Sequence, residues 1–379
     1  MVLSNTDPLY KQCTLSVMDN IADPNITFND DGVCNYYFDY LAEAKKNLLS
    51  PTQAAKELEA IVAKLKLAGK GKKYDCMLGV SGGVDSTYLS LITKRLGLRV
   101  LCVHFDNGWN SELAVQNIEN IVTKCGFDLF TYVINWNEFK DIQLAYFKAN
   151  VIDIEAVTDI AIFACLDKIC SQHNIKYIID GRNIVTESVI PSAWINKDAQ
   201  NLYNIHKQFG TIPLKSYPKI SRVKRNLHFV KKAYQSIPLL NVLAYNKAAA
   251  KKEIVTELNW TDYGGKHYES VFTRFYQGYI LPNKFKVDKR KAHLSNLIYS
   301  GQLTKAEALL ELAQPIYSAT QLAIDKPFVL KKLGMTEATF DAYISTPPES
   351  HSKYGSTKPL SEDYPILKIL KPIKKLLRK

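Results

Sequence analysis

The chain has 379 residues, 46% of them hydrophobic and 23% charged, which is typical of a packed globular protein and excludes a disordered one. At this length we expect about two domains. The net charge of +12 and the isoelectric point near 9.1 favour anionic partners, without discriminating among nucleotides, sugar nucleotides, RNA and a membrane surface.

The cysteines and the apolar runs indicate a compartment. There are seven cysteines, an odd number, and most of them lie in apolar stretches. No N-terminal apolar segment with a cleavage site and no apolar run of membrane-spanning length occurs in the sequence. We therefore expect reduced thiols in a soluble, cytoplasmic protein.

The first 70 residues are predicted to form an N-terminal segment. The stretch up to about Tyr40 is rich in turn residues, and helical spacing follows from Leu41 to Leu67. The glycines and lysines of "AGKGKK" then end the helix.

Strand and helix patterns alternate in residues 71–235, which we predict to be a nucleotide-binding domain. Strands that are apolar throughout indicate a parallel, doubly wound α/β sheet covered on both faces. Residues 236–379 are predicted to be a mostly helical region that contributes to the substrate site. The expected strands are 74–80, 99–105, 129–135 and 176–180, and the expected helices between them are 86–96, 111–124, 136–150 and 155–173.

The turn "SGGVDS" after the first strand is small and polar throughout. A tight turn with a helix cap would explain a glycine and one polar residue. It would not explain a whole turn of the kind that backbone amides need to close around an anion at a helix N-terminus. The sequence lacks GxxxxGK[ST] and GxGxxG, so the Walker and dinucleotide loops are excluded.

SGGxDS after the first strand of such a sheet resembles the PP-loop of the ATP pyrophosphatases, which cleave ATP between the α and β phosphates. The two glycines would let the backbone approach the pyrophosphate, and the serines would offer hydroxyl groups and amides. Asp85 would hold Mg²⁺ or orient the loop; its alternative role is a helix-capping carboxylate. The predicted ATP-binding residues here are Ser81, Gly82, Gly83, Val84, Asp85 and Ser86, with Asp85 and Ser86 also catalytic.

Two further strand ends carry polar residues. "VHFDNGWN" offers His104 and Asp106 beside the adenosine, with Asp106 as a second catalytic and Mg²⁺-binding candidate; a buried structural histidine is the alternative for His104. "IIDGRNIVTES" offers Gly181, Asn183 and Glu187 to the same crevice, with a turn and helix start as the alternative.

A narrower resemblance rests on six blocks scattered between about residues 11 and 313. "SVMDNIADPNITFNDDGVCNYY", "GVSGGVDSTYL", "HFDNGWNSELAVQNI", "IEAVTDIAI", "DGRNIVTES" and the long block that begins "DYGGKHYESVFTRFYQGYILPNKFKVDKRKAHLS" together resemble the N-acetyl sugar amidotransferases of bacterial surface-polysaccharide and nonulosonic acid biosynthesis. The resemblance implies an enzyme of lipopolysaccharide and O-antigen synthesis. With ATP and Mg²⁺ it would convert a sugar acetamido group to an acetamidino group through an O-adenylyl imidate, releasing AMP and pyrophosphate.

The same resemblance implies further site residues. Lys266, Lys289 and Arg290 would lie near phosphates as catalytic residues, and Glu155, Asp159, Trp194 and His267 would contact the sugar. For the long block the alternative is an aromatic core with a solvated basic face.

Ammonia is expected from a separate protein. The chain starts Met-Val and has no G-x-C-x-G elbow, so we expect no glutaminase within it. The resemblance implies a glutaminase partner, together with a cyclase-like subunit, both similar to those of imidazole glycerol phosphate synthase.

The sequence departs from the family near the N-terminus. The family carries two CxxC pairs suited to zinc, whereas this chain keeps only Cys13 and Cys34 of them and has no histidine nearby. We therefore expect no zinc there, and apolar contacts around Ile26 and Phe28 instead.

Two other functions stay open. A tRNA-thiolating PP-loop enzyme would suit the basic charge, but Cys165 and Cys170 have the wrong spacing to share a helix face. A module that binds ATP without cleaving it is the second alternative. The basic tail "ILKILKPIKKLLRK", which Pro372 interrupts, would at most touch a membrane peripherally.

Overall fold

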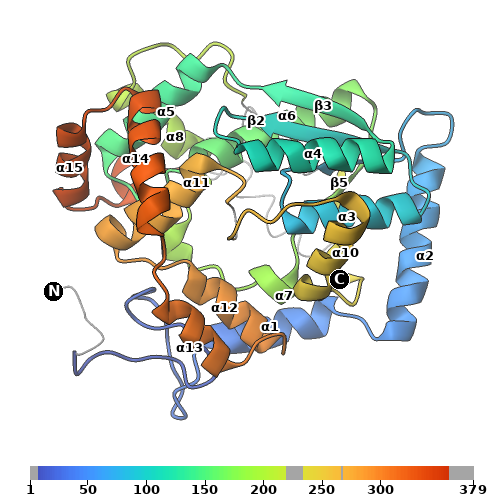
Figure 1. Ribbon diagram of the computed structural model, residues 1–379, viewed down its shortest axis with the longest axis horizontal. Helices are drawn as coiled ribbons and strands as arrows, with labels where there is room; N and C mark the ends of the chain where they lie inside the picture. The colour runs from blue at the N-terminus through green and yellow to red at the C-terminus, as the bar shows by residue number, and fades with distance from the viewer. Residues whose placement is uncertain (1–6, 219–233, 266–267, 358–379) are drawn as a thin grey trace, which may run out of the picture.

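The computed structural model describes residues 7–218, 234–265 and 268–357. Its centre is a five-stranded parallel sheet in the order β3-β2-β1-β4-β5 (Figure 1). The expected α/β class with a doubly wound parallel sheet is confirmed. The chain builds β1 to β3 toward one edge and then returns to β4 and β5 on the other side of β1, so the order reverses between β1 and β4. The strands are β1 (Cys76–Gly79), β2 (Val100–Asp106), β3 (Asp128–Val133), β4 (Tyr177–Ile179) and β5 (Gln235–Ile237).

Each face of the sheet contributes to a separate hydrophobic core, because side chains alternate between the two faces along each strand. Cys76 and Leu78 point to the face covered by α2 (Pro51–Ala68), α3 (Val84–Arg95), α4 (Glu112–Cys125) and α10 (Lys247–Leu258). Met77 points to the opposite face, where α6 (Ala156–Gln172) contributes Cys165 and Ile169. Figure 1 shows α3 and α4 in front of the sheet and α6 behind it.

A second and larger core lies beside the sheet and is mostly helical, as expected. It joins the N-terminal segment to helices from the middle and end of the chain. A buried ion pair between Arg274 of α11 and Asp325 of α14 fixes two of these helices, with Nε and Oδ2 2.5 Å apart. The elements of this part are α5 (Trp136–Ala149), α8 (Ala199–Phe209), α11 (Val271–Phe275), a π-helix (Tyr276–Phe285), α12 (Arg290–Tyr299), α14 (Ala319–Leu333) and α15 (Glu337–Ser345).

Smaller elements connect these parts. α1 (Asn35–Asn47), α12 and α13 (Lys305–Ala313) lie together at one end of the molecule in Figure 1, with the short α7 (Ile184–Glu187) between them and the sheet. Three 3-10 turns complete the described chain, at Ser192–Trp194, Leu239–Asn241 and His351–Tyr354. None of the described helices is long and apolar enough to cross a membrane.

The structure differs from the sequence prediction at three elements. The helical pattern from Leu41 to Leu67 is divided between α1 and α2, because Pro51 occupies the first position of α2 and cannot continue a preceding helix. β3 is an edge strand with exposed residues, not a strand buried on both faces. β5 was not predicted, and with it the sheet extends to Ile237; the domain boundaries near residues 70 and 235 stay a prediction.

Candidate functional site

The loop between β1 and α3 has a shape that only glycine permits at its centre. Gly82 has a φ of +80°, and a Cβ added there would lie 2.6 Å from the carbonyl oxygen of Ala114 in α4. Both the backbone conformation and the close approach exclude a larger residue. The sequence "SGG" therefore brings the loop down onto the start of α4.

Hydrogen bonds hold the carbonyl groups of this loop toward the protein. The indole nitrogen of Trp260 donates to the oxygen of Gly82 at 2.8 Å, and the hydroxyl groups of Ser86 and Thr87 donate to the oxygen of Gly83 at 3.2 and 2.7 Å. The N-cap residue of α3 is Gly83, which has no side chain to cap the first turn. The positive end of the helix dipole and its first amides are thus presented at the loop, as an anion site requires.

Asp85 lies between the loop and the end of β4. The hydroxyl group of Tyr245 donates to Oδ1 of Asp85. A Cβ on Gly181, two residues after β4, would lie in ordinary contact with the Cβ of Asp85, 3.4 Å away, so the end of β4 lies next to this residue. Burial and the Asp85 carboxylate raise the pKa of Tyr245 well above its usual value, which keeps this phenol a hydrogen-bond donor.

A second carboxylate approaches the loop from the C-terminal part of the chain. A Cβ on Gly83 would lie 3.2 Å from the hydroxyl oxygen of Tyr263 and 3.7 Å from Oε1 of Glu269. Burial and Glu269 raise the pKa of Tyr263. The Glu269 segment is anchored to the sheet domain, because the amide of Ser111 donates to its carbonyl oxygen at 2.8 Å.

A magnesium ion is compatible with this loop. Mg²⁺ in proteins is usually bound by one or two carboxylates together with phosphate oxygens and water. Asp85 supplies a carboxylate next to the anion-binding amides, so its chemistry fits. The described residues contain no group of three His, Cys, Asp or Glu side chains that could hold an ion by themselves.

The residues after β2 mainly shape the loop that follows. Nδ1 of His104 lies 3.0 Å from the carbonyl oxygen of Val80, and Nε2 lies 3.0 Å from the amide nitrogen of Asn110. Since the carbonyl oxygen only accepts and the amide nitrogen only donates, these contacts place the proton on Nδ1. Oδ1 of Asp106 accepts from the Gly108 amide at 2.8 Å and from Asn110 at 3.0 Å. His104 is therefore a buried structural histidine, and Asp106 organises the turn at the strand end.

The expected site residues Asn183 and Glu187, which follow β4, have different surroundings. Asn183 caps α7, since its Oδ1 accepts from the Thr186 amide at 2.8 Å, so the helix-start alternative describes its contacts. Glu187 lies close enough to Tyr245 to act on its pKa, and so belongs to the surroundings of Asp85.

A second polar cluster forms where α6 begins. Nζ of Lys289 lies 3.2 Å from Oε2 of Glu155, and Nζ of Lys197 lies 2.9 Å from Oδ2 of Asp159. Gln277 donates to the same oxygen of Glu155 at 3.1 Å. The structure thus brings together two blocks, "IEAVTDIAI" and "KVDKR", that lie far apart in the sequence.

Other expected site residues are placed differently. The indole nitrogen of Trp194 donates to the carbonyl oxygen of Ala22 at 2.8 Å, and the ring is buried in the core; Lys197, three residues later, reaches Asp159 instead. The guanidinium of Arg290 is held by Asp288 and by the carbonyl oxygens of Glu311, Leu312 and Gln314, so it joins α12 to the end of α13 rather than facing a phosphate. The predictions for Lys266 and His267 lie outside the described residues.

Several neighbours of the site were not predicted, namely Tyr245, Trp260, Tyr263, Glu269, Lys197 and Gln277. Tyr263, Glu269 and Gln277 lie in the long aromatic and basic block that the sequence had already marked. No spacing rule connects Tyr245 or Lys197 to their partners, because the contacts depend on tertiary structure.

The two N-terminal cysteines meet each other. The amide of Cys34 donates to Sγ of Cys13 at 3.3 Å, and the hydroxyl oxygen of Tyr299 lies 3.2 Å from Sγ of Cys34. Hydrogen bonding from Cys34 lowers the pKa of the Cys13 thiol. Ile26 belongs to the surrounding core and Phe28 packs against it.

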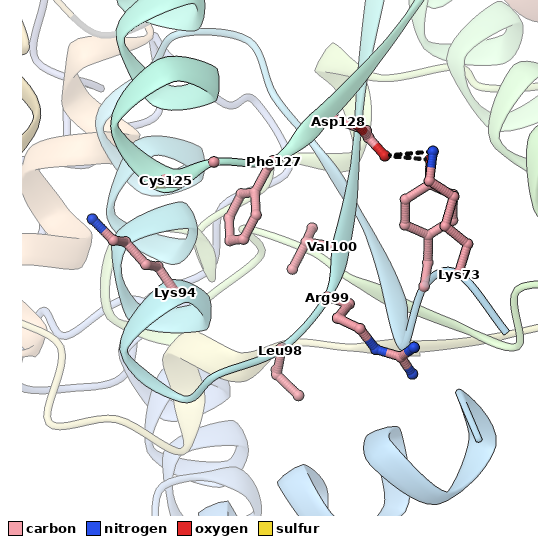
Figure 2. A pocket seen from close by; sticks show the side chains of 10 residues that line it. Lys73, Lys94, Leu98, Arg99, Val100, Cys125, Phe127 and Asp128 are labelled. Carbon is pink, nitrogen blue, oxygen red and sulfur yellow. Dashed lines mark hydrogen bonds and ion pairs between the residues drawn. The ribbon is translucent and has the colours of Figure 1, made fainter. Parts of the chain in front are cut away.

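A hollow of about 320 Å³ lies at the opposite edge of the sheet, where β2 and β3 begin (Figure 2). Lys73 pairs there with Asp128, with Nζ and Oδ2 2.9 Å apart, and Arg99 pairs with the buried Asp75. Ligands of open parallel sheets bind at the carboxyl ends of the strands. We therefore place the functional site at SGGVDS and not in this hollow.

Comparison with known proteins gives a family for the end of the chain. Residues 269–371 match the family described as LPS biosynthesis protein WbpG-like, C-terminal domain. The expected resemblance to bacterial surface-polysaccharide proteins is therefore confirmed for this part, and the chain carries a WbpG-like C-terminal domain. Gln277 and Lys289 of the second cluster lie within it.

Other similarities are more limited. A stretch of 75 residues is 39% identical to the uncharacterised protein MJ1599 of Methanocaldococcus jannaschii, covering 20% of this chain and 26% of that protein, so the chain spans about a quarter of this curated relative. A predicted subunit of tRNA methyltransferase from the same organism is similar over 47% of this chain and 72% of its own, with 14% identity and a TM-score of 0.27. The NMN synthetase of Francisella tularensis is similar over 57% of this chain and 99% of its own, with 11% identity and a TM-score of 0.29.

Proposed function

We propose that the protein is an ATP-dependent amidotransferase of lipopolysaccharide synthesis, which converts the acetamido group of a sugar or sugar nucleotide to an acetamidino group. The observation that carries the proposal is the SGGVDS loop. It presents uncapped amides of α3 at the reversal point of a parallel sheet, in a chain whose C-terminal residues are of the WbpG-like type.

The reaction consists of two displacements. The acetamide oxygen attacks the α-phosphorus of ATP, the bond to the β-phosphate breaks, and pyrophosphate leaves. Ammonia then adds to the imidate carbon and AMP departs with the former amide oxygen, which leaves an amidine. Adenylation is needed because an amide carbon is a poor electrophile and its oxygen a poor leaving group.

The residues of the loop act by binding and orientation. Gly82 and Gly83 let the backbone approach the phosphates, and Ser86 keeps the loop closed, because its hydroxyl group accepts from the Ser81 amide and donates to the Gly83 oxygen. Asp85, oriented by Tyr245, would hold Mg²⁺, which neutralises charge on the leaving pyrophosphate when it is bound. Glu187 and Glu269 lie around the same loop.

The buried cysteines argue against the tRNA-thiolating alternative. Burial raises the pKa of Cys165 and that of Cys170 to about 12 each. Both side chains point into the core between α6 and the sheet. Thiols of this kind are poor nucleophiles, because the thiolate is the reactive form.

Pyrophosphate and AMP release test the proposal. The purified chain is incubated with ATP, ammonium and a panel of acetamido sugars, and the products are examined for one in which NH replaces oxygen. The double variant Asp85→Ala, Ser86→Ala should lose AMP formation by at least about a hundredfold, since it removes the carboxylate and hydroxyl group of the loop. The ion pair of Lys353 and Glu349, 2.7 Å apart on the surface, supplies a control variant, Glu349→Gln.

Two outcomes would contradict the proposal. One is AMP formation by the loop variant at the rate of the unmodified chain. The other is retention of intact ATP by the unmodified chain with every sugar tested, which would favour the non-catalytic nucleotide-binding module.

A further inference from the structure

The cluster at the start of α6 is built from three separate segments of the chain. Glu155 and Asp159 come from α6 and its N-cap, Lys197 from the segment after Trp194, and Lys289 from the residue before α12. Lys197 and Asp159 keep 44% and 35% of their side-chain surface exposed, and Lys289 and Glu155 keep 28% and 17%. The groups are therefore held in place, yet a dissolved molecule can reach them.

The cluster lies at the same edge of the sheet as the SGGVDS loop. α6 leads back to the start of β4, so its N-terminus is at the carboxyl ends of the parallel strands. A direct contact confirms this placement, because the side chain of Asn107, immediately after β2, donates to the hydroxyl oxygen of Thr158 at 3.3 Å. β2 is the neighbour of β1, which ends at SGGVDS.

A buried hydroxyl group of α5 has more hydrogen-bonding capacity than its surroundings use. Tyr146 is fully buried, and among the described residues its hydroxyl group has no hydrogen-bond partner. Burial, followed by the carboxylates of Asp153 and Asp198, raises the pKa of this phenol. Buried polar groups nearly always have a partner, which points to an internal water at this hydroxyl group.

The charges of the cluster limit which chemical groups can bind there. Three carboxylates, those of Asp153, Glu155 and Asp159, face two ammonium groups, those of Lys197 and Lys289. An excess of carboxylates repels phosphate groups, whereas the uncapped amides of α3 attract them. A hydroxyl group suits paired carboxylates and ammonium groups, because it donates to the first and accepts from the second.

We infer that this cluster binds the uncharged, hydroxyl-bearing ring of the sugar substrate, with Glu155, Asp159, Lys197 and Lys289 as its binding residues. The inference rests on the proposed function. Ring hydroxyl groups contact the two ion pairs while the phosphates of ATP stay at SGGVDS, which separates the two ligands along one edge of the sheet. Lys289 is fixed for this task, since its ammonium group also lies 5.6 Å from the ring centre of the buried Tyr276.

Binding measurements without turnover test the inference. Saturation-transfer NMR is recorded with free N-acetylglucosamine, N-acetylgalactosamine and N-acetylmannosamine, and binding of a non-hydrolysable ATP analogue is measured separately by calorimetry. We expect the unmodified chain to bind at least one of these sugars. Glu155→Gln and Lys197→Met should each weaken that sugar about tenfold or more, because each leaves a charged partner without its counterion. Neither variant should change the affinity for the ATP analogue.

The controls separate failure of this inference from failure of the proposed function. Glu349→Gln and Lys353→Met disrupt an exposed ion pair of the same type and should bind sugar as the unmodified chain does. Lys197 is exposed, so its variant should fold even if Glu155→Gln does not. If the ATP analogue binds but no sugar does, or if Lys197→Met binds sugar normally, the inference is wrong and the proposed function stands. If the ATP analogue does not bind the unmodified chain, the proposed function fails.

Discussion

Gly82 is the residue on which the shape of the phosphate loop depends most. Its positive φ and the 2.6 Å separation between an added Cβ and the Ala114 oxygen are two independent obstacles to any side chain. Nearby Gly79 provides a contrast, because a Cβ added there meets nothing within 4 Å.

Replacing these glycines should have opposite results. Gly82→Ala should lower the free energy of unfolding by about 1–3 kcal/mol and weaken ATP binding, because the loop must move away from α4. Gly79→Ala should leave both nearly unchanged. Urea unfolding and calorimetry with an ATP analogue provide the measurements, and equal behaviour of the two variants would show that the loop does not need the described conformation.

Asp153 should make the stability of the protein depend on pH. Burial raises the pKa of this carboxyl group to about 6 in the folded chain, although the Asn196 amide donates to it at 2.7 Å. An acid whose pKa is higher when folded contributes stability that is present below its unfolded pKa and is lost as the pH rises through about 6. The loss between about pH 4 and pH 7 amounts to about 3 kcal/mol at most.

Asp153→Asn should remove this loss while keeping an oxygen that accepts from Asn196. Relative to the unmodified chain, the variant should therefore gain stability at about pH 7.5 and gain much less at about pH 4.5. Urea unfolding at the two pH values measures the difference. A gain of the same size at both would mean that Asp153 does not titrate in this range.

For individual residues, the sequence predicted the SGGVDS loop but not the distant residues that contact the site. SGGVDS is contiguous, so its residue types alone indicated an anion site at the start of a helix. Tyr245 and Lys197 act across the fold on Asp85 and Asp159, and such contacts have no local sequence signature. Trp194 and Arg290 show the reverse error, since residue types that suit a ligand here satisfy backbone carbonyl groups.

Among the elements, the N-terminal segment contains the two cysteines for which we expect no zinc. Cys13 and Cys34 still meet, but their neighbours are Tyr299 and apolar side chains. Lys291 pairs with the buried Asp19, and Lys305 donates to the carbonyl oxygen of Cys13 at 2.8 Å, so α12 and α13 hold the segment from outside. The packing of whole helices therefore holds the segment in place.

Metal removal should consequently have no effect on stability. Dialysis against EDTA is expected to leave the midpoint of thermal unfolding unchanged, and elemental analysis should find no stoichiometric zinc. Lys305→Met, which removes a contact to the segment, should lower the midpoint. A fall in the midpoint with EDTA that zinc alone reverses would contradict this prediction.

The order and type of the main elements followed from the sequence, whereas some of their limits did not. Alternating apolar strands and helices predicted β1 to β4 and α3 to α6 within a few residues. The break between α1 and α2 depends on Pro51 at a helix start, and continuous helical spacing on both sides concealed it. β5 has three residues and gains its strand conformation from pairing with β4, which no short sequence encodes alone.

For the molecule as a whole, the source of ammonia decides whether the chain works alone. We propose that a separate glutaminase, with a cyclase-like subunit similar to that of imidazole glycerol phosphate synthase, supplies it. All seven cysteines lie in the described part of the chain and are buried, and none resembles an accessible glutaminase nucleophile.

The isolated chain should therefore form the amidine with ammonium salts and not with glutamine. Raising the pH from about 7 to about 8.5 should increase the initial rate at fixed total ammonium, because free ammonia is the nucleophile. Product formation is followed by mass spectrometry, with ATP and sugar saturating. Glutamine-dependent turnover by the purified chain alone would contradict the prediction.

The hydrogen bond from Trp260 to Gly82 joins residues that are 178 positions apart. On a ribosome, the motif leaves the exit tunnel long before the indole that holds its carbonyl group in place has been synthesised. A nascent chain or a fragment that ends before Trp260 therefore contains the whole SGGVDS sequence but lacks this hydrogen bond.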